Sequence, residues 1–199
     1  MAITRGYCTL AEVKAALRLN DAIDDTLIEN SVEGASRRID GYCGRFFYQT
    51  TNAIKFFASD AYRLAVPDIS STSGLIVQTD DNGDGSFETT WTLNTDYMLE
   101  PTDAALQSRP YRRITATGGK TFPMFYIPPD AGVQVTATWG FPSIPDDVRE
   151  ACVLLSMRQF ARYNAALGVM AFGDMAVSVR SVDPDVRDLL SPYRVLGVA

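Results

Sequence analysis

The sequence predicts an α+β fold, a helical bundle of about four helices with an antiparallel β insertion between the second and third long helices. Apolar residues recur at helical spacing near both ends of the 199-residue chain. Between those ends, short alternating segments follow one another without an intervening helix, which is typical of antiparallel strands. We therefore expect a single domain over residues 1–199, with a helical part at 1–52 and 143–199 and a β-rich insertion at 53–142.

The first third of the chain is predicted to be helical. Thr9 and Glu12 have the spacing of a capping box, in which two side chains bond backbone N–H groups at a helix start. A longer helix is predicted to begin near Asp24 or Asp25, where a carboxylate stabilises the positive end of the helix dipole. It is expected to end at Gly44, a residue suited to a helix C-cap. Its apolar stripe comprises Ile28, Val32, Ala35, Ile39, Tyr42, Cys43 and Phe46.

The middle of the chain is predicted to form strands. Residues 133–139 alternate between apolar and polar side chains without interruption, which indicates a half-buried strand. Glycine, asparagine and aspartate separate the other predicted strands and favour turns between them. Those strands are expected at residues 54–58, 75–78, 87–93, 97–100 and 111–116.

Two further helices are predicted near the C-terminus. Pro145 suits the first turn of a long helix that runs to about Asn164, with acidic residues at its start. Its apolar residues cover more than one face, so it is either central in the core or buried partly by a neighbouring subunit. Residues 168–176 are apolar and rich in glycine, which fits either a loop folded on its own core or one that docks onto a partner. A short last helix is expected from Pro184 to Leu190.

The composition excludes several functional classes. The chain contains no run of about 18 apolar residues, so we expect no membrane span. A net charge of −6 argues against tight, non-specific binding to DNA, which depends on basic surfaces. The absence of histidine excludes a Ser-His-Asp triad and the usual zinc sites. Cys8, Cys43 and Cys152 are widely spaced and indicate buried free thiols in a reducing compartment.

One loop has the spacing of a cation site. Asp80, Asn82 and Asp84 occupy positions 1, 3 and 5 of a calcium loop, so their oxygens could converge on one hard cation. However, Trp91 takes the place of the glutamate that an EF-hand needs at position 12. The alternative is a hairpin turn in which these side chains cap their own backbone. Apart from possible Ca²⁺ binding, no cofactor is expected.

Several stretches resemble the head–tail connector (adaptor) proteins of tailed bacteriophages. The resemblance covers both helical ends of the chain, whereas the strand-rich middle matches only in general character. These patterns are typical of a fold and not of a catalytic site. Their order along the chain makes the resemblance to this family more specific. The stretches are residues 7–14 (YCTLAEVK), 36–47 (SRRIDGYCGRFF), 144–152 (IPDDVREAC), 183–186 (DPDV) and 190–194 (LSPYR).

The resemblance implies a structural virion protein and not an enzyme. Such a protein is made in the host cytoplasm and located in the neck, at the head–tail interface. It forms a ring beneath the portal protein, commonly twelve-fold, extends the channel for DNA without sequence-specific binding, and docks the next neck protein (a stopper or tail terminator). The C-terminal segment of the family commonly contacts the portal. The contact residues expected here are Leu189, Leu190, Tyr193, Arg194 and Val195, with Met170 and Phe172 of the apolar segment as further partner contacts.

Two other functions are weighed against this one. The first is a calcium-dependent binding or decoration module of a virion, in which the strand block does the work and the helices are scaffold. The second is a carboxylate-based hydrolase, which needs two acids converging in a pocket. Asp24, Asp25, Asp146 and Asp147 are better explained as helix starts, because adjacent residues there do not face each other across a cleft.

Overall fold

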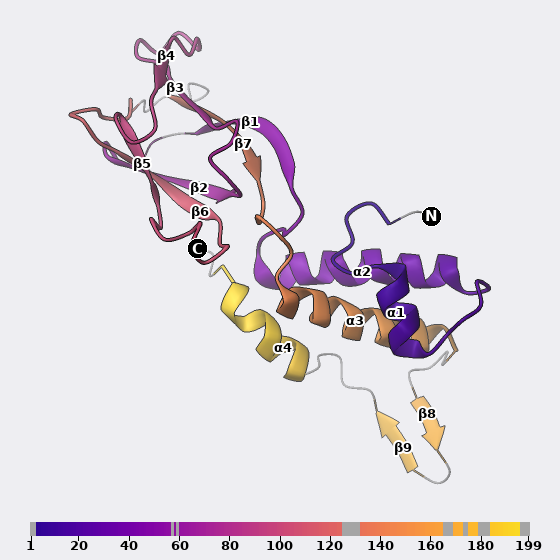
Figure 1. Cartoon of the computed structure of the whole chain (residues 1–199). Helices are drawn as coiled ribbons and strands as arrows, with labels where there is room; N and C mark the ends of the chain where they lie inside the picture. The colour runs from indigo at the N-terminus through magenta and orange to yellow at the C-terminus, as the bar shows by residue number, and fades with distance from the viewer. Residues whose placement is uncertain are drawn as a thin grey trace. The chain divides into compact units, whose positions relative to one another are not determined.

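Helices occupy both ends of the chain and antiparallel strands occupy the middle (Figure 1). This arrangement comes from a computed structural model that describes residues 3–56, 58, 60–124, 132–164, 169–172, 175–178 and 184–195. It confirms the mixed class predicted from the sequence, with four α-helices among the described residues and an antiparallel sheet. By their internal contacts, residues 1–48 and 144–199 form one compact unit, and residues 49–143 form a second. We call these the helical unit and the strand unit.

The helical unit contains α1 (Leu10–Leu17), α2 (Asp25–Cys43), α3 (Asp146–Asn164) and α4 (Pro184–Leu190), followed by a short 3₁₀ helix, η1 (Ser191–Tyr193). The predicted capping box is present, since Thr9 accepts the Glu12 backbone N–H and Glu12 accepts that of Thr9. Gly44 ends α2 at a φ of 66°, a conformation that glycine adopts without strain. The unit also holds the hairpin of β8 (Val169–Phe172) and β9 (Met175–Ser178), which are paired antiparallel.

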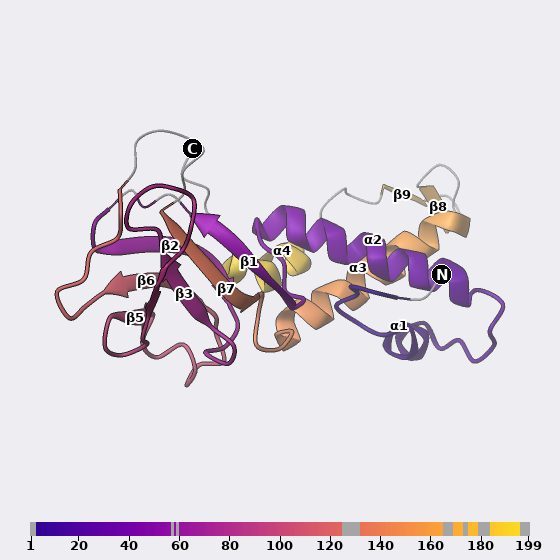
Figure 2. The ribbon, with the colours of Figure 1, turned by 90° about the horizontal axis from the view of Figure 1, so that it is seen from above.

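The core of the helical unit lies mainly between α2 and α3, which run side by side in Figures 1 and 2. Helix α1 packs on both of them, and α4 packs on α3 and α2. The predicted stripe of α2 supplies five fully buried side chains, those of Ile28, Val32, Ala35, Ile39 and Cys43. Opposing them from α3 and α4 are Val148, Ala151, Cys152, Phe160, Val186 and Leu190. None of the described helices is long and apolar enough to cross a membrane.

Tyr7 links the segment before α1 to the C-terminal end of α2. Its hydroxyl donates a hydrogen bond to the Asp40 carboxylate and accepts one from the Phe47 backbone N–H at 2.8 Å. Its own backbone N–H donates to the Ser36 hydroxyl at 3.0 Å, and its ring packs edge-on against Phe47. Burial, together with the bond to Asp40, raises the pKa of Tyr7, so its hydroxyl remains a donor. One side chain thus joins the segment before α1 to the end of α2 and to Phe47 just beyond it.

The strand unit is a seven-stranded sheet in the order β4-β3-β7-β2-β6-β5, with β1 paired to β7 off this path. Its strands are β1 (Thr50–Phe56), β2 (Arg63–Ile69), β3 (Ile76–Thr79), β4 (Thr89–Trp91), β5 (Tyr97–Glu100), β6 (Tyr111–Ala116) and β7 (Val133–Trp139). The strict alternation of β7 places Val133, Val135, Ala137 and Trp139 in the core. Residues 133–136 of β7 lie between β1 and β3, which makes β7 the central strand.

The strand β2 has no counterpart among the strands predicted from the sequence. Pro67 lies inside it, and proline is unusual in a strand because it cannot donate to the ladder. The structure accommodates Pro67 by a shift of register between Ala65 and Ile69, where β2 pairs with β6. Alternate residues such as Leu64 and Val66 are still buried, so the apolar pattern was present but interrupted. The first strand also begins earlier than predicted, at Thr50 instead of residue 54.

We predict that Tyr7→Phe lowers the free energy of unfolding by about 1–3 kcal/mol, because it leaves the Phe47 N–H and the Asp40 carboxylate without their common partner. Denaturant unfolding of the full chain measures the loss. Tyr48→Phe is the matched control, since the Tyr48 hydroxyl only accepts an exposed 3.3 Å bond from Arg5. It should cost less than about 0.5 kcal/mol. Equal effects of the two variants would contradict the role given to Tyr7.

Candidate functional site

The segment after α4 is held against the rest of the helical unit by side-chain and backbone contacts. The Tyr193 hydroxyl donates to Asp147 at 3.1 Å, and its ring lies edge-on to Phe47 with centroids 5.8 Å apart. The Val195 backbone N–H donates to the Cys43 carbonyl at 2.8 Å. These contacts fix residues 191–195 across the end of α2 and the start of α3. The segment that the resemblance singled out is therefore an ordered surface of the helical unit.

The predicted contact residues of this segment differ in exposure. Leu190 is only 2% exposed and packs in the core of the helical unit, where it supports the segment. Its predicted contact with a partner stays a prediction. Leu189, Tyr193 and Val195 are half-buried, and Arg194 is exposed. The Arg194 guanidinium lies 5.1 Å from the centre of the Tyr42 ring, which orients its charge.

Met170 and Phe172 lie on β8, opposite Val177 and Met175 of β9. The structure describes the backbone of the two strands, and the side chains of both residues lie outside what it describes. Their partner-binding role stays a prediction.

A cationic cluster on the helical unit was not predicted from the sequence. The Arg5 guanidinium lies 4.6 Å from the Tyr48 ring centre, and that of Arg37 lies 5.2 Å from the same ring. Arg37 also donates to the Arg5 carbonyl, while the Glu33 carboxylate accepts the Arg5 backbone N–H. Stacking and hydrogen bonds thus hold two exposed cations in fixed positions on an acidic chain. Only the fold shows this cluster, because Arg5 and Tyr48 are far apart in sequence.

The Asp80 loop is held by backbone hydrogen bonds. The buried Asp80 carboxylate accepts the N–H groups of Asn82 at 3.3 Å, Gly83 at 2.7 Å and Gly85 at 2.8 Å. Gly83 and Gly85 have φ values of 79° and 86°, which glycine adopts at little cost. The loop joins strands β3 and β4, as expected for a hairpin turn and unlike an EF-hand. These are the self-capping bonds that the alternative reading of the motif anticipated.

The same loop gathers three carboxylates. Oxygens of Asp80, Asp84 and Glu88 all lie within 4.8 Å of one another. Glu88 was not singled out in the sequence, although it stands at position 9 of the calcium-loop spacing. The Asn82 side-chain amide donates to Asp84 at 3.2 Å and to Glu88 at 3.1 Å, so an amide bridges the two exposed acids. Hydrogen bonds from Ser86 lower the pKa of Asp84.

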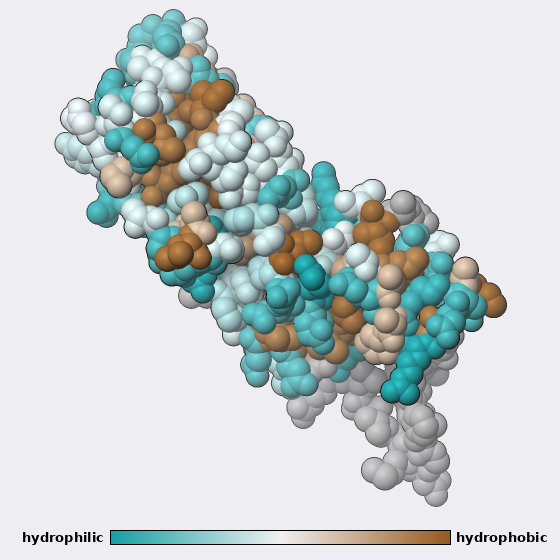
Figure 3. Space-filling view, viewed as in Figure 1, coloured by the Kyte–Doolittle hydropathy of each residue, from teal (hydrophilic) through white to brown (hydrophobic). Residues whose placement is uncertain are grey.

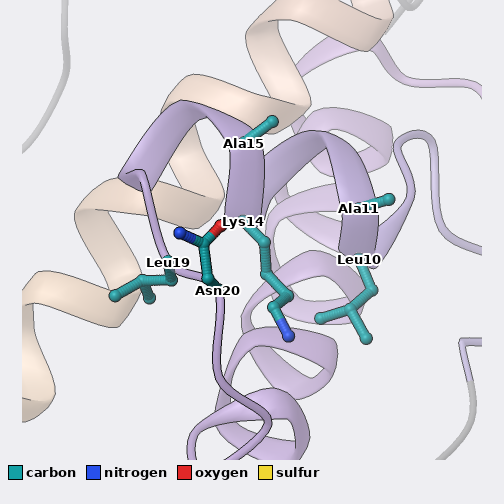
Figure 4. Close-up of a pocket in the computed structure, with 6 residues that line it drawn as sticks. All are labelled: Leu10, Ala11, Lys14, Ala15, Leu19 and Asn20. Carbon is teal, nitrogen blue, oxygen red and sulfur yellow. The ribbon is translucent and has the colours of Figure 1, made fainter.

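A shallow groove on α1 is lined by Leu10, Ala11, Lys14, Ala15, Leu19 and Asn20 (Figure 4). Its one charged group, the Lys14 ammonium, forms a 2.6 Å ion pair with Asp25 and donates to the Asp21 carbonyl. The groove therefore brings together no nucleophile and base among the described residues.

Figure 3 shows small apolar patches separated by polar surface on the face viewed. Ile23, at 87% exposure, is one of the exposed apolar side chains of the helical unit.

The features with a defined geometry among the described residues are thus an ordered C-terminal segment, an exposed arginine cluster and an acidic turn. Residues 7–74 match the family of phage gp6-like head–tail connector proteins. The match confirms the predicted resemblance to head–tail connectors over the first helices and the start of the strand unit. It also confirms the prediction of a structural protein and not an enzyme. No curated protein matches the chain significantly.

Solved structures with a similar fold come from gene transfer agent (GTA) particles. A chain in the neck of the empty GTA particle computed with C6 symmetry has a TM-score of 0.59 and 22% identity, covering 100% of this chain and 95% of that one. A chain in the neck of the native GTA particle computed with C12 symmetry has a TM-score of 0.59 and 21% identity, covering 100% and 94%. A chain in the virion of the native gene transfer agent particle has a TM-score of 0.54, 21% identity and coverage of 100% and 95%. At these identities the likeness shows a shared fold.

We predict that Asp80→Ala, measured in the presence of a metal chelator, destabilises the chain by about 1–3 kcal/mol because three backbone N–H groups lose their acceptor. Asp81→Ala is the control in the same loop. Asp81 is exposed and accepts only the Thr89 hydroxyl, so its loss should cost less than about 0.5 kcal/mol. If Asp80→Ala were as stable as Asp81→Ala, the backbone bonds would not hold the loop.

Proposed function

We propose that this chain is a head–tail connector that forms a ring beneath the portal in the neck of a phage-like particle. The observation that carries the proposal is the family match of residues 7–74 combined with a fold likeness that covers the whole chain. The similar chains belong to necks computed with C6 and C12 symmetry, which supports a ring of identical subunits. A cyclic ring needs two different complementary faces on each subunit. In this proposal the chain acts through those faces.

The two units are proposed to have different roles. We propose that the helical unit is the bundle common to connectors, with the strand unit inserted between α2 and α3. The chain enters and leaves the strand unit at residues 49 and 143, between helices that pack on each other. A net charge of −6 suits a channel through which DNA passes without being gripped, because acidic surfaces repel phosphates.

The portal contact is proposed to include the segment after α4. Leu189 and Arg194 are its accessible apolar and cationic groups, and Arg194 is already oriented by Tyr42. Arginine and apolar side chains at the centre of an interface commonly carry most of its binding energy. Val186 and Leu190 of α4 are buried in the core, so removing the whole segment from Asp183 would also unfold part of the helical unit. Single substitutions at Leu189 and Arg194 therefore test the contact more cleanly.

We predict that the purified chain co-sediments with portal-bearing, DNA-filled capsids in a fixed ratio to the portal. Leu189→Asp and Arg194→Glu should each weaken this binding at least about tenfold. Arg109→Glu, which reverses an exposed charge in the strand unit, should bind like the unaltered chain. Unfolding curves of all variants check that the fold is retained. If the unaltered chain does not bind these capsids, the result contradicts the proposed connector role.

A second candidate function, a calcium-dependent module, is favoured by one observation, the convergence of Asp80, Asp84 and Glu88. A hard cation prefers such oxygen ligands, and the loop could add backbone carbonyls as further ligands. This candidate requires the Asn82 amide to release the two exposed acids that it bridges. In the connector proposal, the same loop needs no ion because its own N–H groups satisfy Asp80.

If the calcium candidate is right, saturating Ca²⁺ raises the Tm of the full chain by several degrees, because a ligand that binds only the folded state stabilises it. Asp84→Asn and Glu88→Gln then abolish the shift, whereas Asp81→Asn, outside the cluster, retains it. Mg²⁺ at the same concentration controls for general salt effects. A Tm that does not respond to Ca²⁺ removes this candidate and leaves the connector proposal untouched.

A further inference from the structure

Two of the three cysteines meet inside the helical unit. The Sγ atom of Cys8, just before α1, lies 3.2 Å from that of Cys152 in α3. Both residues are buried, with exposures of 5% and 0%, and both are free thiols. Cys43, at the end of α2, is equally buried but has no such thiol partner among the described residues. This pair could not be predicted from the sequence, because its members lie far apart along the chain.

The thiol pair occupies a small polar site in an apolar core. The Ser36 hydroxyl lies 3.4 Å from the Cys152 sulfur, and the Ser156 hydroxyl lies 4.0 Å from both sulfurs. Each serine proton is donated to a carbonyl of its own helix, Ser36 to Val32 and Ser156 to Cys152. The Cys8 sulfur, at 3.2 Å, is nearer to the Cys152 sulfur than either serine oxygen.

The hydrogen bond from Cys8 is the largest of several that lower the pKa of Cys152 against the opposing effect of burial, and the same bond raises the pKa of Cys8. Burial instead raises the pKa of Cys43 to about 11. Of the three cysteines, Cys152 therefore has the most thiolate character, and the thiolate is the reactive form.

We propose that Cys8 and Cys152 are a modification site, a thiol pair that a small peroxide oxidises to an intramolecular disulfide. The Cys152 thiolate attacks one peroxide oxygen and breaks the O–O bond, which gives a sulfenic acid and releases the other oxygen as water after protonation. The Cys8 sulfur then attacks the sulfenic sulfur and expels the second oxygen as water. Two thiols lose two hydrogen atoms in total, and one hydrogen peroxide becomes two waters.

The geometry of the folded chain favours a disulfide between Cys8 and Cys152 over one that involves Cys43. A disulfide has an S–S distance of about 2.0 Å, so closure moves the two sulfurs together by about 1 Å. A small neutral oxidant suits a buried site better than a bulky disulfide reagent. The bond would tie the segment before α1 to α3 and thereby link residues that are separated by most of the chain. Once formed, the bond would persist when the protein leaves a reducing compartment, because thiol reductants no longer reverse it there.

The experiment treats the folded full chain with hydrogen peroxide, blocks the remaining thiols with N-ethylmaleimide, and maps tryptic peptides by mass spectrometry. We expect a cross-link between peptides Gly6–Lys14 and Glu150–Arg158, a mass loss of two hydrogen atoms, and Cys43 alkylated after denaturation. Cys43→Ser should give the same cross-link. Cys8→Ser and Cys152→Ser should give none, with unfolding curves as a check on their folds.

The same oxidation in denaturant provides the decisive control. In an unfolded chain the shorter loop closes more readily, so Cys8 should pair mainly with Cys43 there and with Cys152 only in the folded protein. The proposal is overturned if the folded chain yields the same mixture as the unfolded one. It is equally overturned if peroxide converts Cys152 to sulfinic acid while Cys8 remains a free thiol.

Discussion

The Tyr7 hydroxyl group lies between the Asp40 carboxylate of α2 and the backbone N–H of Phe47, and this pair of hydrogen bonds fixes the segment before α1 on the end of α2. The bonds hold the chain that leads into α1 along α2, which brings Cys8 against Cys152. They also fix Phe47, whose ring receives Tyr193 from the opposite end of the chain. A buried hydroxyl that loses a partner costs more than an exposed one, so this node strongly constrains the segments that it joins.

The C-terminal segment shows how one stretch of chain can combine core and surface roles. Leu190 and Val186 fill the core, while Arg194 and part of Leu189 remain accessible. Tyr193 and Val195 connect the two by bonding Asp147 and the Cys43 carbonyl. A partner that binds here meets a surface that is already ordered, which lowers the conformational entropy lost on binding. An adaptor that must dock in a defined orientation benefits from such a surface.

In the strand unit, β7 has the corresponding organising role. Its four buried residues face the core, and its backbone pairs with β1 on one side and with β3 and β2 on the other. The Asp80 loop then closes the β3–β4 hairpin with a buried carboxylate that is saturated by backbone donors. The cluster of Asp80, Asp84 and Glu88 is therefore a structural turn first, and any cation must compete with the hydrogen bonds that the turn already makes.

The sequence by itself determined the local features of this protein. The capping box at Thr9, the stripe of α2, the C-cap at Gly44 and the alternation of β7 depend on neighbouring residues, and all were predictable from spacing. The resemblance to head–tail connectors also rested on local helical patterns and was confirmed over residues 7–74. β2 escaped prediction because Pro67 interrupts its alternation, and its pairing with β6 across a shifted register and with β7 at Ile69 stabilises it. The thiol pair, the stacked Arg5 and Arg37, the contribution of Glu88 and the burial of Leu190 were decided by tertiary structure alone. Each of these depends on which distant segments meet, or on how a turn curls, and no local periodicity encodes that.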